Sequence, residues 1–258
     1  MKNSIRAEIL KICTTRTVYW LFAAMLGLVA FGVLTTSHEQ LGVEQFGSLG
    51  NQMPLVEQEF LFMTGSIVWL FVLLTGLRSF TDEFRHGTIV PSLLANPSRV
   101  RVLLAKVIVV AATAVVFVLG AYALALAIGV PRLGHEGAST NIATLAMASL
   151  LGRVALMSIL WAVVGVAIGL AIRHQVAAIV GSLVWIMFVE MFMEGYAKHV
   201  VKFLPVHATT ALIGPPSVEG SGTGDIVLSA LPGGLMLAGW AAAWIAIGAI
   251  AMLRRDIA

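Results

Sequence analysis

The chain has 258 residues and a net charge of +3, and 59 % of its residues are hydrophobic whereas only 11 % are charged. Soluble domains carry about 25 % charged residues, so this chain has too little polar surface to cover a globule in water. The composition excludes a soluble domain, gives no indication of nucleic-acid binding, and predicts an all-α integral membrane protein with one domain over residues 1–258.

The first segment, residues 2–17, has the pattern of an amphipathic helix. Ile5, Ile9 and Ile12 recur at helical spacing on one face, and charged residues occupy most of the other face. This pattern is typical of a helix that lies in the membrane interface. Cys13, the one cysteine, lies beside the apolar face, where packing is favoured over lipidation. A single cysteine excludes an internal disulfide and a cysteine-rich metal site.

Six later segments are long and apolar enough to cross a bilayer as helices. The first of these segments is longer than the apolar part of a signal peptide, and no A-x-A-like cleavage site follows it. We therefore expect it to stay in the protein. A long outer segment, residues 195–231, precedes the last one. The six predicted spans are residues 18–35, 60–77, 102–130, 154–172, 176–193 and 232–253.

The distribution of basic residues predicts the orientation of these spans. With both termini in the cytoplasm, twelve of the 16 Lys and Arg residues fall on the cytoplasmic side and four on the outer side. An excess of basic residues inside is the usual pattern of membrane proteins. We therefore predict six spans with both termini in the cytoplasm.

The polar segment 78–101 joins the second and third spans and carries signals for two short helices. Thr81 can cap a first helix that begins with Asp82 and Glu83, whose carboxylates favour the positive end of a helix. Gly87 interrupts the chain after this helix.

The second short helix is predicted at Ile89–Ala95. Thr88 can start it, Asn96 and Pro97 end it, and helical spacing places its first residue and Leu93 on one face. A plain connector between helices needs about 2–8 residues. An ordinary connector with charges at the lipid headgroups is the alternative, but the length and the two capped pieces favour a docking element for a cytoplasmic protein.

Two carboxylates near the outer end of the fifth span are candidates for a substrate path or an outer gate. Glu190 and Glu194 lie one helical turn apart, so they could attract a cationic substrate or pair with Arg153. An interfacial position or a gate salt bridge is the favoured alternative to direct contact with substrate.

Two other sets of residues lie within the predicted spans. Gly165 and Gly169, together with Ala162, form a small-residue face that predicts close helix packing. Four tryptophans could line a hydrophobic path, although packing or lipid-facing roles are favoured. These are Trp161, Trp185, Trp240 and Trp244.

Motifs of catalysis and nucleotide binding are missing from the sequence. It contains no G-x-x-x-x-G-K-[ST] loop that would hold ATP phosphates, no H-E-x-x-H and no G-x-S-x-G. The six histidines are scattered over loops and helix ends. We therefore expect no catalytic residues, no metal site and no cofactor bound by this chain.

The segment between the second and third spans carries a motif that extends into the third span. Its residues are Glu83, Phe84, Arg85, Gly87, Thr88, Ile89, Leu93, Leu94, Pro97, Ser98, Arg99 and Lys106. In this motif the segment resembles the corresponding segment of the type-2 superfamily of ABC exporter permeases. The N-terminal amphipathic helix resembles the elbow helix of that family, and the stretch before the last span resembles its outer re-entrant region.

This resemblance implies a multi-pass transport subunit in the lipid bilayer of the cytoplasmic (inner or plasma) membrane of a bacterium. Its partners would supply the energy. Two permease subunits, identical or related, would pair, and each would rest on a separate cytoplasmic ABC ATPase subunit that binds ATP and Mg. The segment 78–101 would be the coupling helix. Its expected contact residues are Asp82, Glu83, Phe84, Arg85, Gly87, Thr88, Ile89, Leu93 and Leu94.

The resemblance further implies export of a hydrophobic or amphipathic compound, such as a drug, a lipid or a peptide. The alternative is a self-sufficient, ion-coupled secondary transporter or channel, which is expected to bury a coupling carboxylate near the membrane centre. Apart from Glu190, which we place toward the outer end, the predicted spans contain none.

Overall fold

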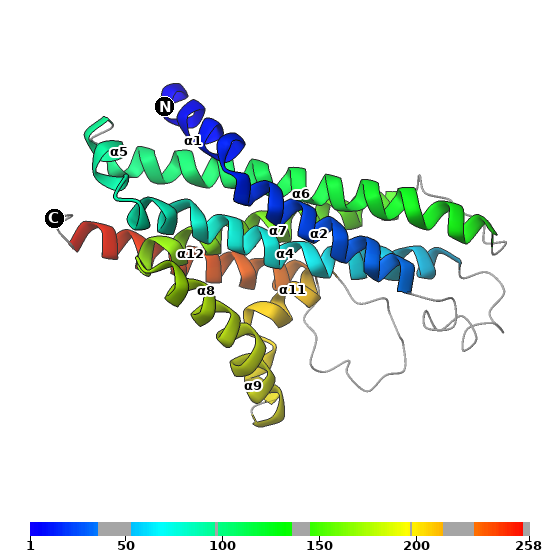
Figure 1. Ribbon diagram of the computed structural model, residues 1–258. Coiled ribbons are helices and arrows are strands. Elements are labelled where there is room, and N and C mark those ends of the chain that lie inside the picture. The colour runs from blue at the N-terminus through cyan, green and yellow to red at the C-terminus, as the bar shows by residue number, and fades with distance from the viewer. Residues whose placement is uncertain (36–52, 96–97, 136–144, 197, 214–229, 255–258) are drawn as a thin grey trace.

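The computed structural model describes residues 1–35, 53–95, 98–135, 145–196, 198–213 and 230–254, and every regular element in these ranges is a helix (Figure 1). The predicted all-α class is therefore confirmed for this part of the chain. The helices are α1 (Lys2–Thr14), α2 (Arg16–Thr35), α4 (Met53–Arg85), α5 (Ile89–Ala95), α6 (Arg99–His135), α7 (Leu145–Ala171), α8 (Gln175–Val184), the π-helical segment η1 (Trp185–Val189), α9 (Glu190–Tyr196), α10 (Lys198–Val201), α11 (Pro205–Ile213) and α12 (Ala230–Arg254).

Five of the described helices are long and apolar enough to cross a membrane. Their apolar parts are Arg16–Thr35, Arg99–Pro131, Ala148–Ala171, Gln175–Met193 and Ala230–Ile250. The remaining expected span, residues 60–77, lies within α4, where side chains are described only from Ile67 onward. The count of six spans and the orientation of the termini therefore remain predictions.

The long helices α2, α4, α6, α7 and α12 run alongside one another and form a bundle (Figure 1). α1, α5 and the end of α12 lie at the same end of this bundle, which we call the base. The continuous stretch of α8, η1 and α9 diverges from the bundle, and α11 lies back against α7 and α12. The predicted break at residues 173–175 is present, because α7 ends at Ala171 and His174 caps α8.

The closest helix contact joins α4 to α7 at glycines of both helices. A methyl group added to Gly165 would meet the carbonyl oxygen of Leu73, and one added to Gly169 would meet that of Leu77. On α4, Gly76 lies equally close to the carbonyl oxygen of Ala162. Small residues let backbones approach in this way, so the predicted small-residue face of the fourth span is confirmed.

Some of the features expected near the base differ in the structure. α4 continues without interruption to Arg85, so the short helix expected to begin at Asp82 is the last turn of α4. Thr81 is no cap, because its hydroxyl is buried and donates to the carbonyl oxygen of Leu77 within the same helix. The amphipathic helix predicted over residues 2–17 is shorter in the structure, because α1 ends at Thr14 and the backbone is extended at Thr15.

We expect Gly165→Ala to destabilise the protein. In an open helix this change is favourable by up to about 1 kcal/mol, but here the added methyl group meets backbone and must force α4 and α7 apart, which typically costs about 1–3 kcal/mol. The midpoint of thermal unfolding in detergent measures the effect. Gly152→Ala on the same helix is the control, because nothing lies near its added methyl group. An equal midpoint for both variants would contradict the close packing.

Candidate functional site

Four charged side chains meet at the base of the bundle, where α1, α4 and α6 come together. We call this group, Glu8, Lys11, Glu83 and Lys106, the buried charge cluster. The Lys106 ammonium, only 1 % exposed, donates to Glu8 Oε2 at 2.9 Å, to Glu83 Oε1 at 2.8 Å and to the carbonyl oxygen of Ser79 at 2.8 Å. Lys11 donates to Glu8 Oε1 at 2.7 Å and to Glu83 Oε1 at 2.6 Å.

The local sequence explains how these groups reach one another. Glu8 and Lys11 are three residues apart on α1 and therefore share a face. Glu83 is in the last turns of α4, and Lys106 lies inside α6 with its ammonium 5.0 Å from the centre of the Phe80 ring. An ammonium has three protons to donate, and all three find acceptors here. Two positive and two negative charges make the cluster formally neutral.

The carboxylates of the cluster stabilise the charged form of Lys11. Burial lowers the pKa of Lys11, but hydrogen bonds and charges from Glu8 and Glu83 outweigh this effect and hold the pKa above its ordinary value. The Lys11 ammonium therefore stays charged at physiological pH. The second oxygen of Glu83, Oε2, is buried and has no hydrogen-bond partner in the part of the chain that is described.

A second polar contact joins the end of α4 to the start of α8. Asp82 accepts from Arg78 at 2.9 Å and from Gln175 Nε2 at 2.9 Å, and Arg85 donates to Gln175 Oε1 at 3.0 Å. Arg173 lies over the ring of Phe84, at 5.3 Å from its centre. Among the residues expected to touch a partner, four thus make contacts within the chain: Asp82, Glu83, Phe84 and Arg85.

The turn between α4 and α5 depends on Gly87, whose φ of +66° is a conformation that residues with a side chain rarely adopt. The Gly87 N–H bonds to the carbonyl oxygen of Phe84, and the Thr88 N–H bonds to that of Glu83. These two bonds form the Schellman motif that ends many helices. The predicted interruption at Gly87 and the predicted bounds of the second short helix are confirmed by α5.

The short helix α5 is anchored on one side and apolar on its outer side. Ile89 is buried, whereas Val90 is 44 % exposed and Leu94 is 79 % exposed. Arg85 and Thr88 are also exposed beside it. The side chain of Leu93 lies outside the described residues. A short helix at the base that presents apolar side chains outward is suited to docking against another protein.

The residues proposed for a substrate path or an outer gate lie in different environments in the structure. Glu190 is buried and accepts a hydrogen bond from the backbone N–H of Val206 at 3.1 Å, in the first turn of α11, with His207 Nδ1 at 3.7 Å. A carboxylate there stabilises the positive end of a helix. Arg153 is exposed on α7, and the Glu194 side chain lies outside the described residues.

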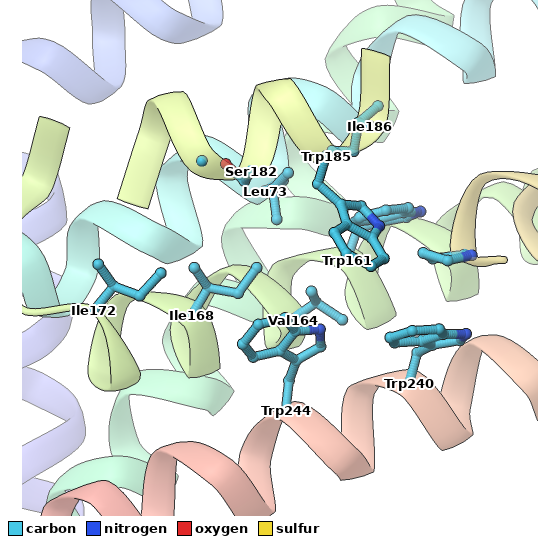
Figure 2. Close-up of a pocket in the computed structure, with 12 residues that line it drawn as sticks. Leu73, Trp161, Val164, Ile168, Ile172, Ser182, Trp185, Ile186, Trp240 and Trp244 are labelled. Carbon is cyan, nitrogen blue, oxygen red and sulfur yellow. The ribbon is translucent and has the colours of Figure 1, made fainter. Parts of the chain in front are cut away.

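All four tryptophans singled out from the sequence line one cavity, which we call the tryptophan cavity. It has a volume of about 190 Å³ and lies between α7, α8–η1 and α12, with Leu73 of α4 and Pro205 of α11 also in its lining. Figure 2 shows Trp240 and Trp244 extending from α12, facing the side on which Trp161 and Trp185 lie. The sequence could not show this grouping because the four residues come from three separate segments.

Sequence reasoning also missed the buried charge cluster as a unit. Lys106 carried a weak signal, since a lysine inside a long apolar segment needs a partner, but nothing in the sequence named Glu8 and Glu83 as those partners. Within the described ranges, no group of three or more His, Cys, Asp or Glu residues could hold a metal ion.

The long apolar helices around a glycine-packed core define a multi-pass membrane protein. A family model described as ABC-2 family transporter protein matches residues 4–189, which is well over half of the chain. The chain therefore belongs to the ABC-2 transporter family and is a membrane subunit of an ABC transporter, and this membership implies association with ABC ATPase subunits. The match spans α1 to η1 and includes the whole buried charge cluster. A comparison with curated proteins finds no match.

We expect Lys106→Met to destabilise the protein strongly. The change leaves the buried carboxylates of Glu8 and Glu83 with only Lys11 to neutralise them, and breaking a buried ion pair in this way typically costs about 3–5 kcal/mol. Thermal unfolding in detergent, followed together with gel filtration, measures the loss. Lys2→Met on the exposed start of α1 is the control. If both variants unfold like the unchanged protein, the cluster does not hold α1, α4 and α6 together.

Proposed function

We propose that this chain is the permease of an ATP-driven exporter, and that α5 together with the turn before it is the coupling helix. The observation that carries the proposal is the buried charge cluster. The helices α4 and α6 flank α5, and the cluster joins both of them to α1, the proposed elbow helix. ATP and Mg would bind on two partner ATPase subunits. The chain would pair with a second permease, identical or related.

The geometry of the base suggests how movement would pass from the motor into the membrane. α4 is helical to Arg85, and only the turn at Gly87 separates it from α5. Pressure on α5 would therefore reach the ends of α4 and α6 at once, and the ion pairs of Lys106 would make them move as one body with α1. Movement of packed helices as rigid bodies is a common form of conformational change.

The residues at the end of α4 and along α5 would fall into three groups with different roles. Glu83 and Ile89 would act as internal anchors, and Asp82 and Phe84 would pass movement to the turn before α8. The outer surface that meets the ATPase would consist of exposed residues. These are Arg85, Thr88, Val90 and Leu94.

An ion-coupled transporter is less well supported by these contacts. Its mechanism needs a buried carboxylate that binds and releases ions, and Glu190 is the residue of the fifth span that could serve. Its carboxylate instead holds the first turn of α11. We propose a structural role for Glu190 at the outer end, where it would keep α11 against the bundle.

We expect Leu94→Asp to release the ATPase. A charge at the centre of an apolar contact must be desolvated, and loss of one central contact residue commonly weakens binding by about tenfold or more. The measurement is the amount of ATPase that co-purifies with a tagged permease. Leu94 is largely exposed, so the change should leave the fold of the permease intact, which a thermal unfolding curve checks.

The matched control is Leu94→Met, which keeps an apolar side chain of similar volume and should retain the ATPase. Equal retention by the Asp and Met variants would place the docking surface elsewhere. Failure of the unchanged permease to retain any ATPase would contradict the exporter proposal itself.

A further inference from the structure

The walls of the tryptophan cavity are almost entirely apolar, and no side chain of the described residues fills its space. On the α7 side the wall is rigid, since Trp161 and Val164 are buried and the Trp161 indole N–H donates to Thr209 Oγ1 at 2.8 Å. Trp240 is also held, by a hydrogen bond from its indole to the carbonyl oxygen of Phe203 at 2.8 Å. Two of the four rings are thus fixed in place by polar contacts outside the cavity.

The size and lining of the cavity indicate the class of molecule that it would accept. A purely apolar cavity of about 150 Å³ in another protein stays dry and binds benzene, and this one holds about 190 Å³. Aromatic rings pack favourably against one another in tilted or offset arrangements. Trp69 and Trp161 already form such a pair, with ring centres 4.6 Å apart. A flat aromatic guest would add a further ring to this group.

The cavity opens to the outside of the bundle along α8 and η1. Gly181 is exposed, and Trp185 is 43 % exposed at the rim, whereas Trp161 on the opposite wall is 2 % exposed. The π-helical turn begins at Trp185, and such turns inside α-helices are frequent at functional sites. In a membrane this open side would face lipid, so an apolar guest could enter directly from the bilayer.

We propose that the tryptophan cavity is a binding site for a flat, uncharged aromatic molecule of one or two fused rings that enters from the lipid. Binding itself requires only the permease. That the bound molecule is cargo of the transporter rests on the proposed function.

A photolabelling experiment on the purified permease in lipid nanodiscs tests the binding. The probe is an uncharged aryl diazirine, and the competitor is excess naphthalene. Labelled peptides are identified by mass spectrometry, and only labelling that naphthalene suppresses is counted. We expect such labelling on α7 and α12 at the cavity, because the guest is enclosed there, and not on helix faces that merely contact lipid.

Gly181→Phe is the decisive variant. Nothing lies within 4 Å of a methyl group added at this cavity-lining glycine, so a larger side chain can occupy the open space without meeting backbone. We expect it to reduce the suppressible labelling by about tenfold, since guest and phenyl ring compete for one volume. Gly27→Phe on α2 is the matched control, because that glycine is equally open and lies outside the cavity. Trp244→Ala, which removes a wall, should also weaken labelling.

Three results would overturn the binding proposal. Labelling at the cavity that naphthalene does not suppress would mean that lipid chains occupy it. Labelling equal in the Gly181→Phe and Gly27→Phe variants would mean that the guest binds elsewhere. Conversion of a dimeric permease to monomer by Gly181→Phe alone would mean that a second copy of the chain covers the cavity.

A separate measurement tests the role as cargo. In the permease assembled with its ATPase, naphthalene should stimulate ATP hydrolysis above the basal rate. Gly181→Phe should abolish this stimulation, whereas the control Gly27→Phe should retain it. Stimulation that survives in the Gly181→Phe variant would overturn the assignment as cargo. If no ATPase assembles with the permease, the proposed function fails, whereas the photolabelling result still decides whether the cavity binds.

Discussion

Neutralisation of a buried lysine is the constraint on which the base of this protein depends. An ammonium that is removed from water is stable only when carboxylates and carbonyl groups replace its hydration. Lys106 on α6 therefore needs Glu83 from the end of α4 and Glu8 from α1, and it obtains both at hydrogen-bond distance. Because each partner lies on a different helix, satisfying one charge positions the elbow helix and both neighbours of α5 in a single step.

The molecule combines this tightly held part with a loosely packed one. Between α4 and α7 the glycines leave no room for a methyl group, and the buried charge cluster holds the base. The α8–η1–α9 stretch instead diverges from the bundle and leaves the tryptophan cavity beside α12 (Figures 1 and 2). Elements with few buried contacts are those that move most readily. A rigid part beside an adaptable one is the arrangement that the proposed function would use to convert movement at the base into movement within the membrane.

The contrast between α5 and the end of α4 shows which kinds of signal sequence reasoning can use. The bounds of α5 were predicted correctly because Gly87 and the Asn96-Pro97 pair act on the backbone of their immediate neighbours. Thr81 was wrongly predicted to be a cap, because a threonine side chain can bond to the backbone both at the start of a helix and inside one. Burial against other helices decides which of these two positions the residue takes, and a local sequence pattern does not contain that information. The same limit explains why Glu83 was expected at a partner surface, whereas it lies inside.

By itself the sequence determined the membrane class, the helical composition, the short helix α5 and the small-residue face, because hydrophobicity, breakers and spacing act within one segment. Only the tertiary structure decided which charges pair, that Glu190 holds α11, and that four tryptophans share one cavity. These features join residues that are far apart in the chain. In an apolar chain the same local sequence pattern is compatible with many such pairings, and the packing of the whole bundle selects one of them.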